Sequence, residues 1–189
     1  MFLGSRHDPN RDGIQWFISS VLPIVRHEIP DFRLAVAGPV TQIIAQRHDK
    51  AILESDGVYP LGVAQWVAPL YQVAQMIIVP IRRGEGVSIK TIEAFGYGKA
   101  VVTTTVGLRG LPRDIDHSSF DDAEAFAARV IRLATDEAER RAAEAISLRL
   151  HKSLFHQEIY DQNFKKMLSS IGRERKAQEH LGAISRNDC

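Results

Sequence analysis

The sequence predicts an α/β fold, a Rossmann-like doubly wound parallel sheet with helices on both faces. Short apolar runs alternate with longer segments whose apolar residues recur at helical spacing, which is the order of consecutive βα units. One run, residues 76–81, is almost continuously apolar, as expected of a parallel strand that is covered on both faces.

The first half of the chain predicts three strands that alternate with three helices. The helix after the first strand has apolar residues at helical spacing from Ile14 to Val25, and Asp12 is a candidate N-cap for it. Thr41 is the candidate cap of the next helix, and Pro60 weakens the third strand. The expected strands are residues 2–4, 32–38 and 58–62, and the two later helices are residues 41–53 and 65–74.

The second half continues the alternation and then becomes mainly helical. A helix ended by glycine is expected at 88–98, and a β-branched strand at 100–106. Residues 173–189 lack an apolar stripe. We therefore expect one domain at residues 1–170 and a C-terminal tail, either a frayed helix or a mobile segment, at 171–189.

Composition and charge exclude several classes of protein. With 44% hydrophobic and 25% charged residues and no long apolar run, we expect neither a disordered chain nor a membrane span. A net charge of +1 gives no basic field for nucleic acid. The single cysteine, Cys189, cannot form an internal disulfide, which fits a reducing, cytoplasmic location.

A ligand is expected at the carboxyl ends of the first and fourth strands. In a sheet with Rossmann-like strand order, these strands flank the switch point where ligands bind. The loops that leave them, residues 5–13 and 82–88, are polar, basic and contain glycine. They offer Arg6, His7 and Arg11 from the first loop, and Arg82, Arg83 and the amides of Gly84, Gly86 and Val87 from the second.

The charges around Ser88 indicate an anionic ligand. A helix that starts there presents unpaired N–H groups and partial positive charge, which disfavours Arg82, Arg83 and Lys90 nearby. A bound phosphate or diphosphate would resolve this conflict, because the amides and the cations would share one anion. Since the two arginines are adjacent, at most one faces the ligand, and Arg83 is our choice.

Two carboxylates accompany this helix start. Glu93 borders the apolar stripe of the helix, where it could accept two hydroxyls of a sugar such as ribose, and Glu85 could reach another part of the same ligand. The plain alternatives are an exposed pair of Glu93 with Lys90 and a solvated Glu85. His7 is either a general base or a solvated loop residue, and Arg109 either faces the crevice or belongs to a structural loop.

Three stretches of the sequence together resemble a known family. Residues 85–111 read EGVSIKTIEAFGYGKAVVTTTVGLRGL, in which Glu85 and Glu93 form a Glu-x7-Glu motif. With residues 2–39 and 60–81, this order resembles the C-terminal, donor-binding domain of the group 1 (family 4) retaining glycosyltransferases of the GT-B fold. The resemblance covers residues 2 to roughly 168 and implies one half of a GT-B fold.

The resemblance implies a nucleotide-sugar donor and no cofactor or metal, because cations would do the metal's usual work on the leaving group. It implies that Glu85 is catalytic, through contact with the donor sugar, and that Glu93 binds the nucleotide ribose. It also implies sites for the diphosphate and the base, and a cation in place of the family's usual lysine after the first strand. These are Gly86, Val87, Ser88, Arg83 and Lys90 for the diphosphate, Gly62 and Val63 for the base, and Arg11 or else Arg6 for the cation.

The resemblance further implies a missing N-terminal domain that binds the acceptor, such as a polysaccharide or a lipid-linked sugar. The chain alone would then bind donor and transfer little, residues 155–168 would pack toward the missing half, and any association with the inner face of the membrane would come through that half. The chain departs from the commonest family pattern at residues 87–90, which read VSIK, although the lysine resembles one subgroup. The alternatives are part of a sugar-nucleotide epimerase and a stand-alone nucleotide- or protein-binding module of flavodoxin-like shape.

Overall fold

The computed structural model describes residues 1–46, 50–112, 115 and 117–155. The chain divides into two compact units, Met1–Leu150 and His151–Cys189, and the first unit holds every strand of the described part. The expected boundary at residue 170 and most of the helix expected at 155–168 lie outside the described residues.

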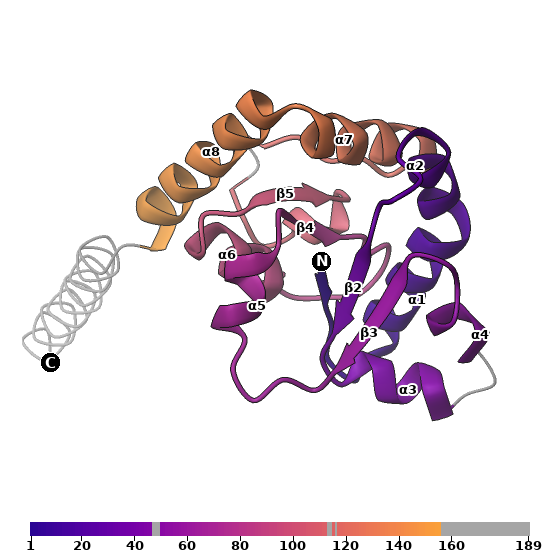
Figure 1. The fold of residues 1–189 in the computed structure, drawn as a ribbon. Helices are drawn as coiled ribbons and strands as arrows, with labels where there is room; N and C mark the ends of the chain where they lie inside the picture. Colours follow the sequence, from indigo (N-terminus) through magenta and orange to yellow (C-terminus); the bar gives the residue numbers. More distant parts are fainter. Residues whose placement is uncertain (47–49, 113–114, 116, 156–189) are drawn as a thin grey trace, which may run out of the picture. The chain divides into compact units, whose positions relative to one another are not determined.

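The described residues include five strands, which pair in parallel within a group of three and a group of two (Figure 1). In the first group Phe2 of β1 lies opposite Val36 of β2, and Leu34 of β2 lies opposite Val58 of β3. In the second group Met76 of β4 lies opposite Ala100 of β5. The strands are β1 (Phe2–Leu3), β2 (Leu34–Ala37), β3 (Val58–Gly62), β4 (Met76–Val79) and β5 (Ala100–Thr103).

Met1 joins the two groups of strands. Its amino group donates to the Met76 carbonyl at 2.8 Å, and the Ile78 N–H donates to the Met1 carbonyl at 3.0 Å. The strand order is therefore β3-β2-β1-β4-β5, which puts the switch point between β1 and β4 as the sequence predicts.

Helices cover both faces of the sheet, with α1 to α4 to the right of the strands in Figure 1 and α5 and α6 to their left. The helix α7 packs on α2 and against β5. The helices are α1 (Asp8–Trp16), a π-helical turn (Phe17–Val21), α2 (Leu22–Glu28), α3 (Val40–Gln46), α4 (Lys50–Leu53), α5 (Ala68–Val73), α6 (Ile89–Gly96), a 3-10 turn (Val106–Leu108), α7 (Ala123–Thr135) and α8 (Glu137–Phe155).

Two predicted N-caps are wrong. The helix α1 begins at Asp8, with His7 in the cap position and Pro9 in its first turn, so Asp12 lies inside the helix. The fixed φ of proline suits a first turn, which moves the helix start toward β1. Thr41 lies inside α3, and its hydroxyl donates to the Gly38 carbonyl at 2.9 Å instead of accepting from the helix.

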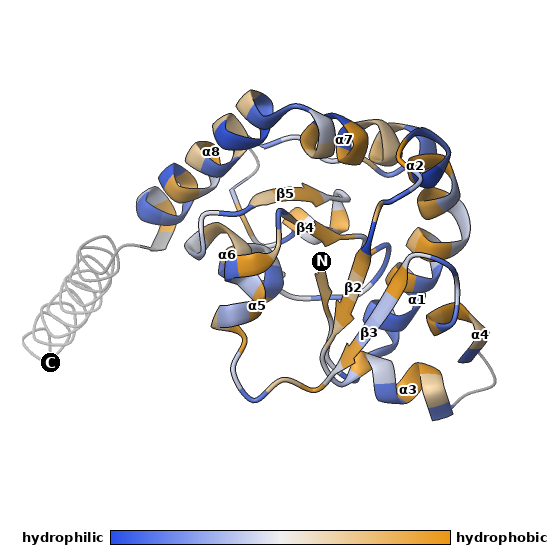
Figure 2. Ribbon diagram, in the orientation of Figure 1, coloured by the Kyte–Doolittle hydropathy of each residue, from blue (hydrophilic) through white to orange (hydrophobic). Residues whose placement is uncertain are grey.

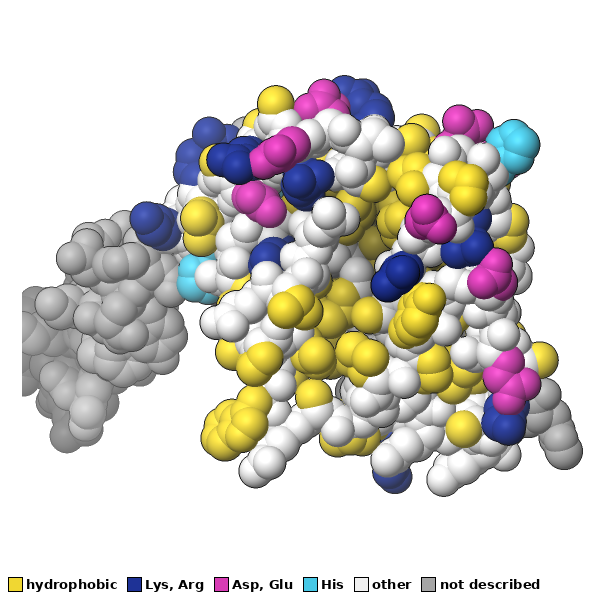
Figure 3. Space-filling view, viewed as in Figure 1, with side chains coloured by type: hydrophobic (Ala, Val, Ile, Leu, Met, Phe, Trp, Pro, Cys, Tyr) yellow, Lys and Arg dark blue, Asp and Glu magenta, His cyan; other side chains and the backbone are white. Residues whose placement is uncertain are grey.

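Burial differs between the two edge strands. Every residue of β4 is buried, as its continuous apolar run predicts, and every residue of β5, against which α7 packs, is buried too. In β3, at the other edge, only Val58 is buried. Figure 2 shows the strands as largely hydrophobic and α7 and α8 as alternating. Hydrophobic side chains gather on the exposed face around β3 and α5 (Figure 3), where Tyr59 and Leu61 are about half exposed.

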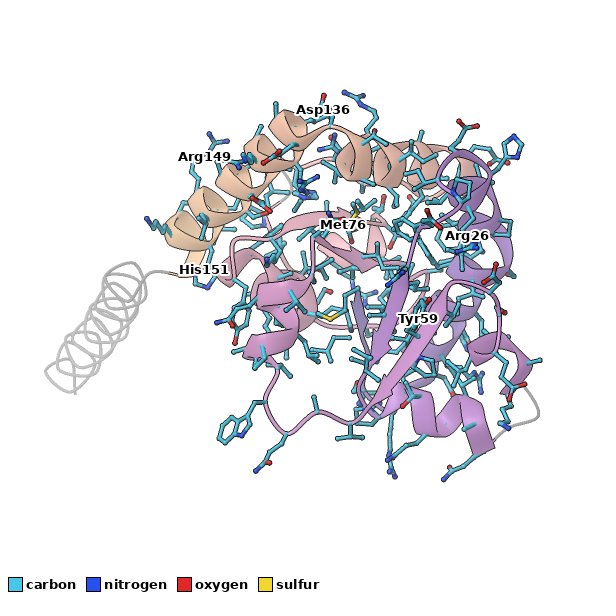
Figure 4. The ribbon with its side chains drawn as sticks, in the orientation of Figure 1. Arg26, Tyr59, Met76, Asp136, Arg149 and His151 are labelled. Atoms are coloured by element: carbon cyan, nitrogen blue, oxygen red, sulfur yellow. The ribbon has the colours of Figure 1, made fainter. Side chains whose placement is uncertain are left out.

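Arg26 fastens the end of α2 to the segments around β2 and β3 (Figure 4). Its Nη1 donates to the Phe32 carbonyl at 2.8 Å, and its Nη2 pairs with Asp56 at 2.5 Å. This contact lies at the amino ends of the strands, opposite the edge of the sheet where the cavity described next opens.

Candidate functional site

A cavity of about 490 Å³ lies at the switch point between β1 and β4. Its size is in the range of small-molecule sites. One wall is the segment after β1, with Ser5, His7 and Asn10, and the other is residues 83–90. We call this cavity the crevice.

The β1 wall is held by a buried asparagine for which no pattern in the sequence predicts a role. Asn10 is buried, and its Nδ2 donates to Ser5 Oγ at 2.9 Å and to the Ser5 carbonyl at 3.2 Å. Gly13 allows α1 to lie against the end of β4, since a Cβ there would lie 2.4 Å from the Pro80 carbonyl oxygen. The two walls are therefore packed together directly.

The adjacent arginines diverge, as their spacing predicts. Arg83 lines the crevice, whereas the Arg82 guanidinium lies over the Trp16 ring at 5.0 Å. Arg83 also pairs with Asp12 of α1, with 2.6 Å between Nε and Oδ2. Partial burial alone would raise the pKa of Asp12, but the hydrogen bonds from Arg11 and Arg83 bring that pKa below its usual value.

Lys90 is the half-buried cation of the crevice. It lies in the first turn of α6 and lines the cavity. Burial lowers the pKa of Lys90, and the nearby Glu93 carboxylate offsets part of this effect. No ion pair joins it to Glu93 or to any other carboxylate in the part of the chain that the structure describes. The exposed Glu93–Lys90 pair is therefore not formed.

The structure places Arg6 and Arg11 away from the crevice lining. Arg6 donates to the Gln42 side chain, and Arg11 lies against Asp12 at 2.8 Å and against Asp8 at 3.3 Å. Both arginines thus have partners on α1 or α3.

The backbone amides at the start of α6 divide into two kinds. The Ser88 N–H donates to the Arg109 carbonyl at 3.2 Å, so this amide is occupied. The N–H groups of Gly86 and Val87 have no hydrogen-bond acceptor among the described residues. Both residues line the crevice. Gly86 has a φ of 79°, which favours glycine.

The two carboxylates lie in different surroundings. Glu85 lines the crevice, is exposed and has no hydrogen bond or ion pair within the described part of the chain. Glu93 lies one helical turn beyond Lys90, outside the lining, and its Oε2 accepts a hydrogen bond from the Tyr71 hydroxyl at 3.0 Å. Tyr71 is fully buried and stacks on Tyr97, with 4.2 Å between ring centroids. Burial, with the Glu93 charge, raises the pKa of Tyr71.

Gly62 and Val63 do not line the crevice. Gly62 ends β3 with a φ of 69° and open space around its Cα, and Val63 is about half exposed. They lie at the same edge of the sheet as the crevice, because the carboxyl ends of parallel strands share that edge.

Arg109, for which the sequence leaves two interpretations open, lines the crevice too. Its side chain donates to the carbonyls of Gly84 and Gly86, so it faces the crevice and also belongs to a structural contact. The sequence signal is the flanking pair Gly107 and Gly110, which marks a turn that approaches other backbone closely.

The doubly wound sheet, with amides and cations gathered at its switch point, defines an α/β domain with a crevice lined by cations and backbone amides. The family model described as "Glycosyl transferases group 1" matches residues 1–136. The chain belongs to this family.

Comparison with known proteins agrees with this assignment. An uncharacterized 44.6 kDa protein in the cps region of Klebsiella pneumoniae is 27% identical over 181 residues, which are 92% of this chain and 45% of that protein. The chain thus spans less than half the length of this curated relative.

Solved structures of glycosyltransferases share the fold. The pneumococcal O-GlcNAc transferase GtfA, in complex with UDP and GlcNAc, superposes with a TM-score of 0.62 at 16% identity, over 90% of this chain and 35% of that one. A mutant of TarM from S. aureus, in a complex that includes UDP, gives 0.67 at 12% identity, over 87% and 34%. A glycosyltransferase from Rickettsia africae gives 0.52 at 21% identity, over 87% and 47%. The likeness places the chain in one half of a GT-B fold.

Proposed function

We propose that this chain is the donor-binding half of a retaining glycosyltransferase, which transfers a hexose from a nucleotide-sugar to an acceptor. One observation carries the proposal: the amides of Gly86 and Val87, which have no acceptor among the described residues, line the same crevice as Arg83 and Lys90, at the N-terminus of α6. This arrangement fits a diphosphate, because oriented amides, the helix dipole and cations all favour negative charge there.

Each proposed role follows from the surroundings of a residue. The cations and amides would stabilise the diphosphate leaving group without a metal. Glu85, open to the crevice and without a partner among the described residues, would contact the donor sugar. Glu93 uses Oε2 for Tyr71, which leaves Oε1 for a ribose hydroxyl. Gly62 and Val63 would contact the base at the same edge of the sheet.

The structure changes the expected list of phosphate ligands. The Ser88 amide is occupied by the Arg109 carbonyl, so Gly86 and Val87 are the donors we propose for the diphosphate. Arg6 and Arg11 would need to leave their partners before either could take the place of the family's usual lysine.

The acceptor site is proposed to lie in a second domain. The chain spans 45% of its curated relative and 35% of GtfA, which supports a larger functional unit. By itself the chain would bind donor and transfer little. The location of the relative in a cps region supports a role in polysaccharide synthesis, which we place in the cytoplasm. None of the helices in the described part could cross a membrane. We assign any peripheral membrane association to the second domain.

Thermal unfolding with UDP, GDP, ADP and their sugars tests the proposal. A ligand that binds only the folded state raises Tm, and at 100 times Kd it adds about 2.7 kcal/mol. We expect one nucleoside diphosphate to raise Tm at millimolar concentration and Glu93→Gln to reduce the rise. Glu54→Gln, at an exposed position directly after α4, is the matched control and should leave the rise unchanged. No shift with any nucleotide would refute the donor site and favour a protein-binding module.

A further inference from the structure

Arg109, in the turn that follows β5, reaches the loop that carries Glu85. Its Nε donates to the Gly86 carbonyl at 3.0 Å, and its Nη1 donates to the Gly84 carbonyl. These two carbonyl groups belong to the residues on either side of Glu85. We propose that Arg109 is a positioning residue, which fixes the place of the Glu85 carboxylate in the crevice.

The loop that carries Glu85 needs such a support because its two glycines allow its backbone many conformations. Gly84 has a φ of 131° and Gly86 a φ of 79°, and glycine loses more backbone freedom on ordering than any other residue. Glu85 between them is exposed, and its side chain has no hydrogen bond to a described residue. The hydrogen bonds from Arg109 therefore restrain this segment, which the Glu85 side chain does not anchor. A guanidinium suits this task, because its donors form a rigid planar fork.

The support itself is fixed to the sheet and to α6. The Arg109 carbonyl accepts from the Ser88 N–H at 3.2 Å, and the Thr91 hydroxyl donates to the Gly107 carbonyl at 2.6 Å. Thr91 and Gly107 are buried, and a Cβ on Gly107 would lie 2.0 Å from Thr103 Oγ1. The guanidinium thus extends from a turn that has little room to move, which is what a positioning residue requires.

Arg109 also sets the direction of an amide. Peptide units are planar, and no cis peptide bond occurs in the described residues, so a carbonyl and the next N–H point in opposite directions. A Gly86 carbonyl held by Arg109 therefore turns the Val87 N–H away from the guanidinium. The Val87 N–H therefore does not donate to the turn around Arg109, whose carbonyl accepts from the Ser88 N–H.

Backbone ¹⁵N relaxation of the chain tests the positioning role without a ligand. In Arg109→Ala we expect the order parameters of the Glu85 and Gly86 amides to fall from about 0.85 to below about 0.6. Arg109→Lys keeps the charge but lacks the planar fork of donors. Its order parameters should therefore lie between those of the wild type and those of Arg109→Ala. Arg83→Ala, which removes a crevice cation that bonds neither carbonyl, should leave these amides rigid. Unchanged order parameters in Arg109→Ala would overturn the proposal.

A second arm, which rests on the proposed function, measures the Kd of a nucleoside diphosphate and of its nucleotide-sugar. The Kd of the nucleoside diphosphate divided by the Kd of the nucleotide-sugar reports the contact between Glu85 and the sugar. We expect Arg109→Ala and Glu85→Gln each to reduce this ratio about tenfold, with no further loss in the double variant, because the two residues act as a unit. If Arg109→Ala loosens the loop but keeps the wild-type ratio of Kd values, the positioning role is overturned. If the wild-type chain binds no nucleotide, the proposed function fails, while relaxation still decides the role of Arg109.

Discussion

The two walls of the crevice hold their charged side chains in different ways. On the β1 wall the arginines have protein partners, with Arg6 on Gln42 and Arg11 on Asp12. On the β4 wall Lys90 and Glu85 have no ion-pair partner among the described residues. The first wall thus uses its charges to hold the fold together. The second wall also contributes Arg83 to the pair with Asp12, but it leaves Lys90 and Glu85 to a ligand at some cost in stability.

Met1, which joins the two groups of strands, gives the largest expected effect. Burial lowers the pKa of the Met1 α-amino group from 8.0 to about 5. The unfolded chain then binds more protons than the folded chain between these values, so stability is full above about pH 8 and falls as the pH drops toward 5. The loss is at most about 4 kcal/mol, at 1.36 kcal/mol per pKa unit. Urea unfolding from pH 8.5 to 5 measures it.

Acetylation of the Met1 amino group is the matched control. The acetylated nitrogen keeps an N–H for the Met76 carbonyl and cannot be charged. The dependence of stability on pH above 5 should therefore shrink. An equal dependence in the acetylated chain would show that another group carries it.

Lys90→Met should weaken nucleotide binding while it makes the free protein more stable. Loss of a charged hydrogen bond to the diphosphate should weaken nucleotide binding about 10- to 100-fold. The free protein should become more stable by up to about 1 kcal/mol, because burial disfavours the charged amine. Titration calorimetry and chemical unfolding measure the two effects.

Arg11→Met is the matched substitution on the other wall. Because Arg11 lies outside the crevice lining and pairs with Asp12, this variant should change nucleotide affinity by less than about threefold while reducing stability. Equal losses of affinity for Lys90→Met and Arg11→Met would remove the distinction between the walls.

Tyr71→Phe tests whether Glu93 is held for a ribose. The variant removes one hydrogen bond to the carboxylate, worth about 1 kcal/mol, so affinity for the nucleoside diphosphate should fall about fivefold. Affinity for the 2′-deoxy analogue should fall less. Tyr97→Phe is the control, because Tyr97 stacks on Tyr71 and its hydroxyl does not contact Glu93. A similar loss for both variants would mean that ring packing, and not the hydrogen bond, matters.

Asp12→Asn should have the smallest effect. It frees Arg83 from an ionic partner and removes a negative charge beside the crevice, so affinity for pyrophosphate should rise about two- to threefold. Asp8→Asn, whose wild-type carboxylate lies against Arg11, should not produce this rise. A fall in affinity for Asp12→Asn would show that Asp12 orients Arg83 for the ligand instead of competing with it.

The sheet could be predicted from the sequence because its strands differ from its helices in simple patterns. The continuous apolar run of β4 predicted full burial, and βα alternation predicted the switch point between β1 and β4. The adjacent positions of Arg82 and Arg83 predicted their divergence. The burial of β4 and the divergence of the arginines follow from local periodicity, whereas the switch point also required the assumption of a Rossmann-like strand order.

The parts that could not be predicted depend on contacts distant in sequence. The Ser88 amide is occupied by Arg109, 21 positions away, and Glu93 is bound by Tyr71, 22 positions away. The predicted start of α1 was also wrong, because Pro9 places the first turn of this helix ahead of Asp12. The roles assigned to the site residues by resemblance stay predictions until a ligand is bound.

The most direct test is a map of amide chemical shifts during titration of the ¹⁵N-labelled chain with the nucleoside diphosphate that raises Tm. We predict that the largest shifts are at Gly86 and Val87, whose N–H groups would take up the phosphate oxygens, with a smaller shift at Ser88, whose N–H is already bonded. Shifts confined to other surfaces, with Gly86 and Val87 unchanged at saturation, would contradict the account.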